Sequence, residues 1–441
     1  MSSVPRITGK AANPTNLIDA NDIVKSWPEE VIYECSKHIN KLSDICTLSL
    51  LSKHFFLVVF NDKFPTWQTV LASHFPSSCQ RTQPIPQPIA FYKHLKAINH
   101  QLKTGTHQTR TLCAQQSDIQ CLSVQGASLI SGSWDSSFAI WDLKSGNLQR
   151  HVPLLNKGKS YCMKIKGGKI FSGLADGTIK VWDMNSGEML HSLKDHVGAI
   201  NDIKESDGKL ISTSTDGVIN IWDIASGQLR HTLADNCGYS FDCIEVRDGK
   251  LISDCYSSRI KVWDLESGKL LYSGNAQHDG NIKGLAVQDD KVVSCSYSVD
   301  HPRCSTIKIW DLKTGQLLHT LKKEQGPINS LQVSDGMIIY GTWQKTIKVW
   351  DLESGNELHT LVDPYARTTC LKVNDGMLFS ASGDHMIKIW DLATGQLFRS
   401  LEVPEGDIDR LEINDGMIIV GLGNGKIKIF DFTPQSESPK R

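Results

Sequence analysis

The sequence predicts an all-β ring of eight repeated four-stranded sheets, preceded by a small all-α module. Three observations lead to this fold class. An aromatic residue followed by Asp recurs at a nearly fixed spacing, Asp-Gly and Ser/Thr-Gly signals separate short apolar runs, and the spacing of apolar residues is helical before residue 72. A fixed period of about 40 residues means an array of identical structural units, so the repeat decides the architecture.

A two-residue motif sets the repeat. An apolar residue is followed by Trp-Asp, or once by Phe-Asp, and the gaps between successive aromatic residues are 41, 40, 41, 47, 40, 40 and 40. Large aromatic side chains supply packing area between neighbouring sheets, so we expect them in the core. The eight aromatic residues are Trp141, Trp182, Trp222, Trp263, Trp310, Trp350, Trp390 and Phe430.

Each unit reads as four strands. Around Trp222, the segments AINDIKES, DGKLISTST, DGVINIWD and ASGQLRHTL carry apolar runs separated by turn residues. Asp-Gly between alternating runs is a hairpin signal, because a tight primed turn needs positive φ at its central positions. Ser-Gly or Thr-Gly before the fourth run marks another turn. The unit is therefore predicted to be a four-stranded antiparallel sheet.

The repeat resembles the WD-repeat β-propeller family over residues 106–431. The resemblance implies an eight-bladed propeller, since one such sheet cannot bury two apolar faces alone. The last unit supplies only three strands before the polar tail, residues 432–441. The segment THQTRTLC, residues 106–113, matches the fourth strand of the other units. Pairing these two ends would close the ring and remove a free sheet edge.

The internal hydrogen-bonding set of this family is only partly present. His196, Asp216 and Trp222 stand at the matching places of one unit, and His278 is the only other His in the same frame. We therefore expect the geometry of individual blades to depart from the family pattern.

The first 105 residues differ from the repeat. Residues 1–18 are rich in Pro, Asn, Ser and Thr and are expected to be a disordered tail. Residues 19–71 carry apolar residues at three- and four-residue spacing, which predicts a small helical module. Residues 72–105 combine the Pro-rich linker TQPIPQP with a predicted helix, AFYKHLKAINHQLK, which would act as a stalk into the ring.

The helical module resembles an F-box. The family opening Leu-Pro-x-Glu-Ile corresponds to WPEEV at residues 27–31, and the register continues without a gap to Trp67. The resemblance implies docking on a Skp-type adaptor in a cullin complex, through an apolar patch that so small a domain cannot bury alone. The alternative is a three-helix cap that packs on the propeller. The residues expected in the patch are Trp27, Pro28, Val31, Ile32, Leu42, Ile45, Leu48 and Leu51.

A target is expected on the face made by the loops that precede each first strand and join each second strand to the third. Related F-box propellers hold phosphorylated peptides there with Arg side chains. This chain lacks such an Arg cluster, and Asp242 and Asp409 would oppose a phosphate. Positive charge near this face comes only from Lys283, Arg303, Lys345 and Arg367.

Aromatic side chains stand out on this face instead. Trp134 and Trp343 each precede the repeat Trp by seven residues, and Tyr161 and Tyr256 are expected at similar height. Exposed aromatic residues are typical binding hot spots, so these four residues and the four basic residues are the predicted target-binding set. The alternative is that the two tryptophans lie over neighbouring loops and cover blade edges.

The 47-residue gap places extra residues near SVDHPRC, residues 298–304, between the second and third strands of one unit. An insertion on this face is a usual place for partner specificity. Cys295, His301 and Cys304 lack the tight spacing of a metal site, so neither a metal nor a cofactor is expected.

Three functions were compared. The leading interpretation is a non-catalytic substrate receptor of a Skp-cullin-F-box type ubiquitin ligase. The second is a protein-interaction scaffold unrelated to ubiquitin. An enzyme is not favoured, because no phosphate loop, zinc-protease motif or recurrent set of channel carboxylates is present. The close likeness of the repeats also fits a bacterial effector that mimics such a receptor in a eukaryotic host.

Composition limits the partners and the compartment. A net charge of -1 over 441 residues gives no electrostatic reason to expect nucleic acid. No membrane span or export signal is expected from the sequence. The 12 scattered cysteines suggest reduced thiols, so we expect the cytoplasm or nucleus, or the host cytosol for an effector.

Overall fold

The computed structural model describes residues 97–433, except residues 99, 104, 106, 136, 154–159, 235–240, 242, 255–257, 275–277, 299–303, 322–323 and 364–367. The chain divides into two compact units, Met1–Lys96 and Ala97–Arg441. The predicted tail, the F-box-like module with all eight predicted adaptor-binding residues, and most of the linker and stalk lie outside the described residues.

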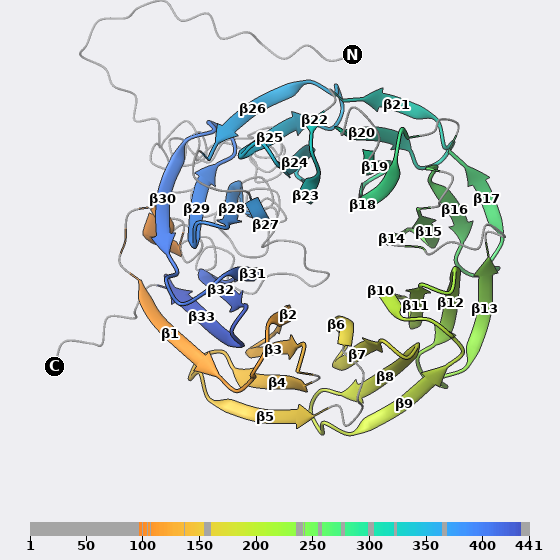
Figure 1. The fold of residues 1–441 in the computed structure, drawn as a ribbon, viewed down its shortest axis with the longest axis horizontal. Coiled ribbons are helices and arrows are strands. Elements are labelled where there is room, and N and C mark those ends of the chain that lie inside the picture. Colours follow the sequence, from red (N-terminus) through yellow and green to blue (C-terminus); the bar gives the residue numbers. More distant parts are fainter. Residues whose placement is uncertain are drawn as a thin grey trace, which may run out of the picture. The chain divides into compact units, whose positions relative to one another are not determined.

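The second unit is built from eight antiparallel sheets that follow one another around a ring (Figure 1). The first four sheets are β2 (Ile119–Gln125), β3 (Ser128–Ser133), β4 (Ser137–Asp142) and β5 (Leu148–Pro153); β6 (Ser160–Lys166), β7 (Lys169–Leu174), β8 (Thr178–Asp183) and β9 (Met189–Lys194); β10 (Ile200–Ser206), β11 (Lys209–Ser214), β12 (Val218–Asp223) and β13 (Leu229–Ala234); and β14 (Ile244–Arg247), β15 (Lys250–Ser253), β16 (Lys261–Asp264) and β17 (Leu270–Ser273).

The other four sheets complete the circle. They are β18 (Asn281–Gln288), β19 (Lys291–Ser298), β20 (Cys304–Asp311) and β21 (Leu317–Thr320), with β22 (Glu324–Gln325) also paired to β20; β23 (Ile328–Ser334), β24 (Met337–Thr342), β25 (Thr346–Asp351) and β26 (Glu357–Val362); β27 (Thr368–Asn374), β28 (Met377–Ser382), β29 (Met386–Asp391) and β30 (Leu397–Glu402); and β31 (Ile408–Asn414), β32 (Met417–Leu422) and β33 (Lys426–Asp431) with β1 (Gln108–Cys113).

The ring closes through its two ends, as the sequence predicts. β1 pairs antiparallel with β33, and Leu112 lies opposite Ile427. The innermost strands touch in an unbroken circle, because β2 contacts both β6 and β31. The prediction of eight blades, with segment 106–113 supplying the last strand, is therefore confirmed.

The repeated aromatic residues lie between neighbouring sheets. Trp222 is 3% exposed and packs with Phe171, Ile179 and Val181 of the preceding sheet. The same arrangement recurs around the ring, and all eight aromatic residues of the repeat are buried. The prediction that they form the core is confirmed, and it explains why the motif keeps its register through the ring.

The turn residues have the backbone conformation that their sequence predicts. Asp207 and Gly208 have φ of 50° and 74°, as a primed two-residue hairpin requires. The Asp of the Trp-Asp motif shapes the next turn: Asp223 Oδ1 accepts a hydrogen bond from the Ser226 backbone N–H at 2.8 Å. This contact explains why Asp and a following Ser-Gly or Thr-Gly recur together.

The end of the predicted stalk packs on the ring. Residues 97–98 and 100–103 are helical. Ile98 and Leu102 are buried among Met377, Phe430 and neighbouring residues of the last two sheets.

The insertion lengthens a hairpin. β19 and β20 have 8 residues each, whereas β11 and β12 have 6. The sequence predicts that the extra residues fall in the connecting loop, but part of them extends the two strands. The short strand β22 pairs with the added segment, because Gln325 lies opposite Cys304.

Candidate interaction surface

One end of the ring gathers two kinds of loop. In a sheet of four successive antiparallel strands, the turn between strands two and three lies at the same end as the connection to the next sheet. Backbone hydrogen bonds join these loops: the Trp134 N–H donates to the Asp118 carbonyl at 3.1 Å, and the Gly423 N–H donates to the Asp407 carbonyl at 3.0 Å. We call this end the top face.

Trp134 and Trp343 lie on the top face with exposed side chains. Trp134 follows β3 and is 40% exposed, and Trp343 follows β24 and is 48% exposed. Trp343 packs its Cβ near the backbone of Gly326, so part of the residue is anchored. The rings are therefore not fully used in covering blade edges. Their role in binding a target stays a prediction.

The other predicted target-binding residues are only partly described. Lys283, on β18, and Lys345, beside Trp343, are exposed. The side chain of Tyr161, on β6, lies outside the described part of the chain, as do Tyr256, Arg303 and Arg367. The target-binding set as a whole therefore stays a prediction.

A buried hydrogen-bond network fixes the top-face loops in the third sheet. His196 Nδ1 lies 2.9 Å from Asp216 Oδ2, and His196 Nε2 lies 2.8 Å from Ser212 Oγ. The Trp222 indole N–H donates to the same Ser212 Oγ at 2.9 Å. Burial raises the pKa of Asp216, but hydrogen bonding to His196 and to backbone N–H groups outweighs it and holds the pKa below its usual value. The network ties the entering loop to the central Trp.

The fifth sheet has a related network without the Asp. His278 Nε2 lies 2.7 Å from Ser294 Oγ, and its Nδ1 lies 3.0 Å from Thr306 Oγ1. Trp310 donates to Ser294 at 2.7 Å. Burial lowers the pKa of His278 to about 3, so the ring stays neutral near neutral pH.

Other sheets replace the His by different polar groups. In the first sheet, the Gln115 side-chain amide donates to the Ser137 carbonyl at 3.0 Å and accepts from Ser131 Oγ at 2.6 Å. In the seventh, Lys388 Nζ lies 2.6 Å from Asp363 Oδ1, and both side chains are buried. In these two sheets other polar side chains thus occupy the place of the His, which sequence reasoning did not anticipate.

The carboxylates of Asp409 and Asp118 and the Cβ of Asp407 lie close together on the top face between the eighth and first sheets. A side chain placed at Gly423 would meet Asp409 Oδ2 at 3.4 Å, Asp118 Oδ1 at 3.9 Å and the Asp407 side chain at 3.9 Å. Burial, followed by the charges of Asp118 and Asp407, raises the pKa of Asp409. Its buried Oδ2 has no hydrogen-bond donor among the described residues. The sequence placed Asp409 on this face but gave no signal for its approach to Asp118.

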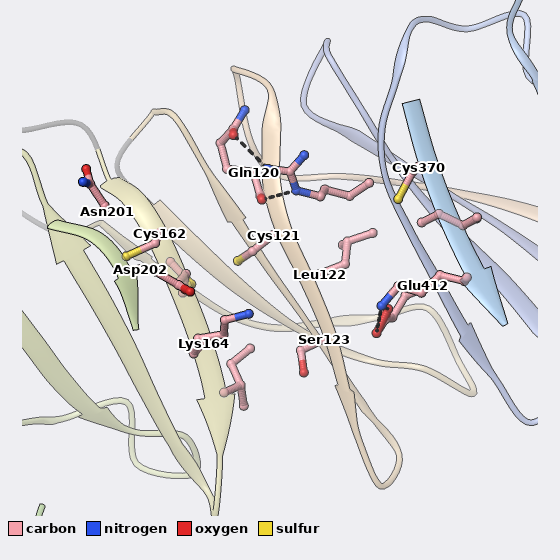
Figure 2. Close-up of a pocket in the computed structure, with 15 residues that line it drawn as sticks. Gln120, Cys121, Leu122, Ser123, Cys162, Lys164, Asn201, Asp202, Cys370 and Glu412 are labelled. Atoms are coloured by element: carbon pink, nitrogen blue, oxygen red, sulfur yellow. Dashed lines mark hydrogen bonds and ion pairs between the residues drawn. The ribbon is translucent and has the colours of Figure 1, made fainter. Parts of the chain in front are cut away.

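The ring encloses a cavity of about 460 Å³ along the innermost strands (Figure 2). Its wall carries Cys121, Cys162 and Cys370, each from a different strand. Burial raises the pKa of the Cys121 thiol to about 11 and that of Cys162 further still, so neither thiol is an activated nucleophile.

The charged groups of this cavity are largely paired. Lys372 Nζ lies 2.6 Å from Glu412 Oε2. The Arg410 guanidinium donates to the Gln120 carbonyl at 2.5 Å and reaches the Gln120 amide oxygen at 3.3 Å. Such contacts join the innermost strands of neighbouring blades, and we assign the cavity no reaction.

Metal and membrane sites were also considered. The described residues contain no group of three or more His, Cys, Asp or Glu side chains that could hold a metal ion. Cys295 and Cys304 are buried, and His301 lies outside the described part. Among the helical residues that the structure describes, none forms a helix long and apolar enough to cross a membrane.

Comparisons with known proteins agree on the ring. The family model described as "WD domain, G-beta repeat" matches residues 106–142, 187–223, 315–351 and 355–391. The crystal structure of the computationally designed Ika8 protein is similar at 30% identity and a TM-score of 0.67, covering 73% of this chain and 98% of that one. No F-box family model matches the chain. A search of curated proteins gives no match.

Proposed function

Because this chain belongs to the family of WD-repeat β-propellers, we propose that it is the substrate receptor of a Skp-cullin-F-box type ubiquitin ligase. Propellers of this family are in general non-catalytic scaffolds that hold protein partners. The more specific role assigns the adaptor to the module at residues 19–71 and the target to the top face of the ring. The domain boundaries drawn from the sequence belong to this proposal, as does a place in the cytoplasm, the nucleus or a host cytosol.

Two observations support the two halves of this role. The F-box-like sequence, which matches the family without a gap from Trp27 to Trp67, supports binding to the adaptor. The exposed tryptophans Trp134 and Trp343 support a protein target on the top face. A receptor needs no catalytic group, and the described thiols of the cavity are not activated.

Adaptor binding tests the proposal. We would titrate the full chain with a purified Skp-type adaptor and measure association by calorimetry at micromolar concentrations. Leu48→Asp should abolish binding, because it places a charge in the predicted apolar patch. Val197→Asp is the matched control: Val197 is 90% exposed on the ring, so this variant should bind as the wild type does. If the wild type forms no complex, the ligase role is wrong and the scaffold interpretation replaces it.

A further inference from the structure

Four consecutive sheets carry an unusual set of residues at one position of the top face. The position directly after the second strand holds Trp343 in the sixth sheet, Gly383 in the seventh, Gly423 in the eighth and Trp134 in the first. These sheets are neighbours around the ring, from β23–β26 through β27–β30 and β31–β33 to β2–β5 (Figure 1). We call this stretch the tryptophan arc, defined by residues 343, 383, 423 and 134.

The two middle positions of the arc carry no side chain. A Cβ added at Gly383 would meet no atom of the described residues within 4 Å. Gly423 likewise lacks a side chain where the sixth and first sheets carry a Trp. At Gly383 and Gly423 an extended peptide could therefore approach the backbone without meeting a side chain of the residue itself.

The charge at the Trp134 end is negative and incompletely compensated. Carboxylate oxygens of Asp118 and Asp409 lie near the empty Cβ position of Gly423, whereas the Asp407 carboxylate lies 3.6 Å from His385 Nδ1. The neighbouring cation, Arg410, is engaged by the backbone and side-chain oxygens of Gln120. Asp409 Oδ2 is buried without a donor among the described residues. A buried carboxylate oxygen without a partner is costly, and a cationic donor would remove that cost.

We propose that the tryptophan arc binds an extended basic segment of a partner protein, with a Lys or Arg side chain held between the Trp134 ring and the carboxylates of Asp118 and Asp409. Trp134 is adjacent to Asp118, because its N–H donates to the Asp118 carbonyl. The ring face would add a cation–π contact to the charged hydrogen bonds. Trp343, at the other end of the arc, would take an apolar side chain of the same segment.

This inference rests on the proposed function for its target site, and it names the chemistry of the target. The three acids would repel a phosphorylated peptide. Burial, and after it the charges of Asp118 and Asp407, raise the pKa of Asp409, because each disfavours its negative charge. A bound cation should lower that pKa.

A peptide selection tests the inference with the full chain. A display library of randomised, unphosphorylated 12-residue peptides would be selected on immobilised wild-type protein, and the affinities of the enriched peptides measured by fluorescence anisotropy. The variant Asp118→Asn/Asp409→Asn removes two charges from the arc with little change in shape. The control Asp207→Asn/Asp248→Asn removes two charges from turns between first and second strands, at the opposite end of the ring, where φ is 50° and 49° and Asn is tolerated. Circular dichroism would verify the fold of both variants.

We expect the selected peptides to share a Lys or Arg, and to bind the Asp118→Asn/Asp409→Asn variant about tenfold more weakly or worse. The control variant should bind them as the wild type does. Raising the salt concentration should weaken the wild-type complex. Trp134→Ala should also weaken it.

Three results would overturn the inference: no enrichment of basic peptides, equal loss in the control variant, or binding that improves when the two acids are removed. If the peptides fail but the adaptor still binds, the inference falls and the proposed receptor role stands. If the peptides bind but the adaptor does not, the ligase role falls and the arc remains a peptide site.

Discussion

Replacing Lys388 by Met is expected to destabilise the ring by about 3–5 kcal/mol. Lys388 Nζ lies 2.6 Å from Asp363 Oδ1 and 3.0 Å from Asp384 Oδ2. The Asp363 side chain is 0% exposed and the Lys388 side chain 8% exposed. Removing the ammonium therefore leaves a fully buried carboxylate without the Lys388 charge, although Ser382 Oγ still donates to Asp363 at 2.9 Å.

The pKa of Lys388 shows the same balance. Burial lowers this pKa, but hydrogen bonds and charges from Asp363 and Asp384 outweigh burial and raise it above its ordinary value. The attraction between Lys388 and its two Asp partners thus outweighs the cost of burying the ammonium. Truncating Lys388 removes that attraction and leaves the Asp363 carboxylate buried.

Lys348→Met is the matched control. Lys348 occupies the same place in the sixth sheet, but its partner Glu357, at 2.9 Å, has a side chain that is 33% exposed. Water can solvate that carboxylate, so the loss should be about 1 kcal/mol or less. The assay is urea unfolding followed by tryptophan fluorescence and circular dichroism.

A double variant distinguishes the loss of the ion-pair attraction from the cost of leaving the Asp363 carboxylate buried without Lys388. Lys388→Met with Asp363→Leu removes both partners and should recover most of the stability that Lys388→Met loses. The reasoning is refuted if Lys388→Met costs no more than Lys348→Met, or if the double variant is less stable than the single one.

Three further predictions concern acid stability, ring closure and thiol reactivity. The pKa of His278 falls from 6.5 to about 3 on folding, so between these values the unfolded chain holds a proton that the folded chain lacks. Below pH 6.5, this residue should lower the free energy of unfolding by about 1.4 kcal/mol per pH unit of acidification. The variant His278→Gln, which imitates Gln115, should therefore lose less stability than the wild type between pH 7 and pH 5 in urea unfolding. Equal losses in the two proteins would contradict this prediction. Lys426→Cys should form a disulfide with Cys113 on oxidation, because these residues are paired across β1 and β33; peptide mapping without this link would argue against the closed ring. Burial raises the pKa of Cys121 to about 11, so iodoacetamide at pH 8 should alkylate it far more slowly than the exposed Cys113, as mass spectrometry would show.

The regular parts of the ring follow from the sequence because they depend on local signals. The period of the aromatic residues gave eight blades, and the three-stranded last unit pointed to β1 as the closing strand. Asp207-Gly208 has the positive φ that its residue types favour. Each of these features is decided within a few residues or by a repeated pattern.

The remaining features depend on contacts between distant segments. Asp118 and Asp409 meet only because the ring brings its two ends together, and no local pattern records that approach. The buried Asp363–Lys388 pair, which replaces a His network, could not be predicted either. Lys348 occupies the same strand position in the sixth sheet, yet it pairs with a partly exposed acid.

For the insertion, the sequence predicted the location correctly but not the structure. Its location between second and third strands was readable from the 47-residue gap. In the structure these residues lengthen β19 and β20, which pair with each other, and β22, from beyond β21 in the chain, also pairs with β20. Local spacing therefore located the extra residues but not their fold.

The most direct measurement of the receptor role is ubiquitin transfer in a reconstituted reaction. The full chain would be combined with a Skp-type adaptor, a cullin with its RING partner, a ubiquitin-loaded conjugating enzyme and a test protein fused to a segment selected on the tryptophan arc. The account predicts ubiquitin on the fused protein only when this chain is present, with loss of transfer in both Leu48→Asp and Trp134→Ala/Trp343→Ala. Transfer that is equal without the chain, or absent although adaptor and segment both bind it, would contradict the account.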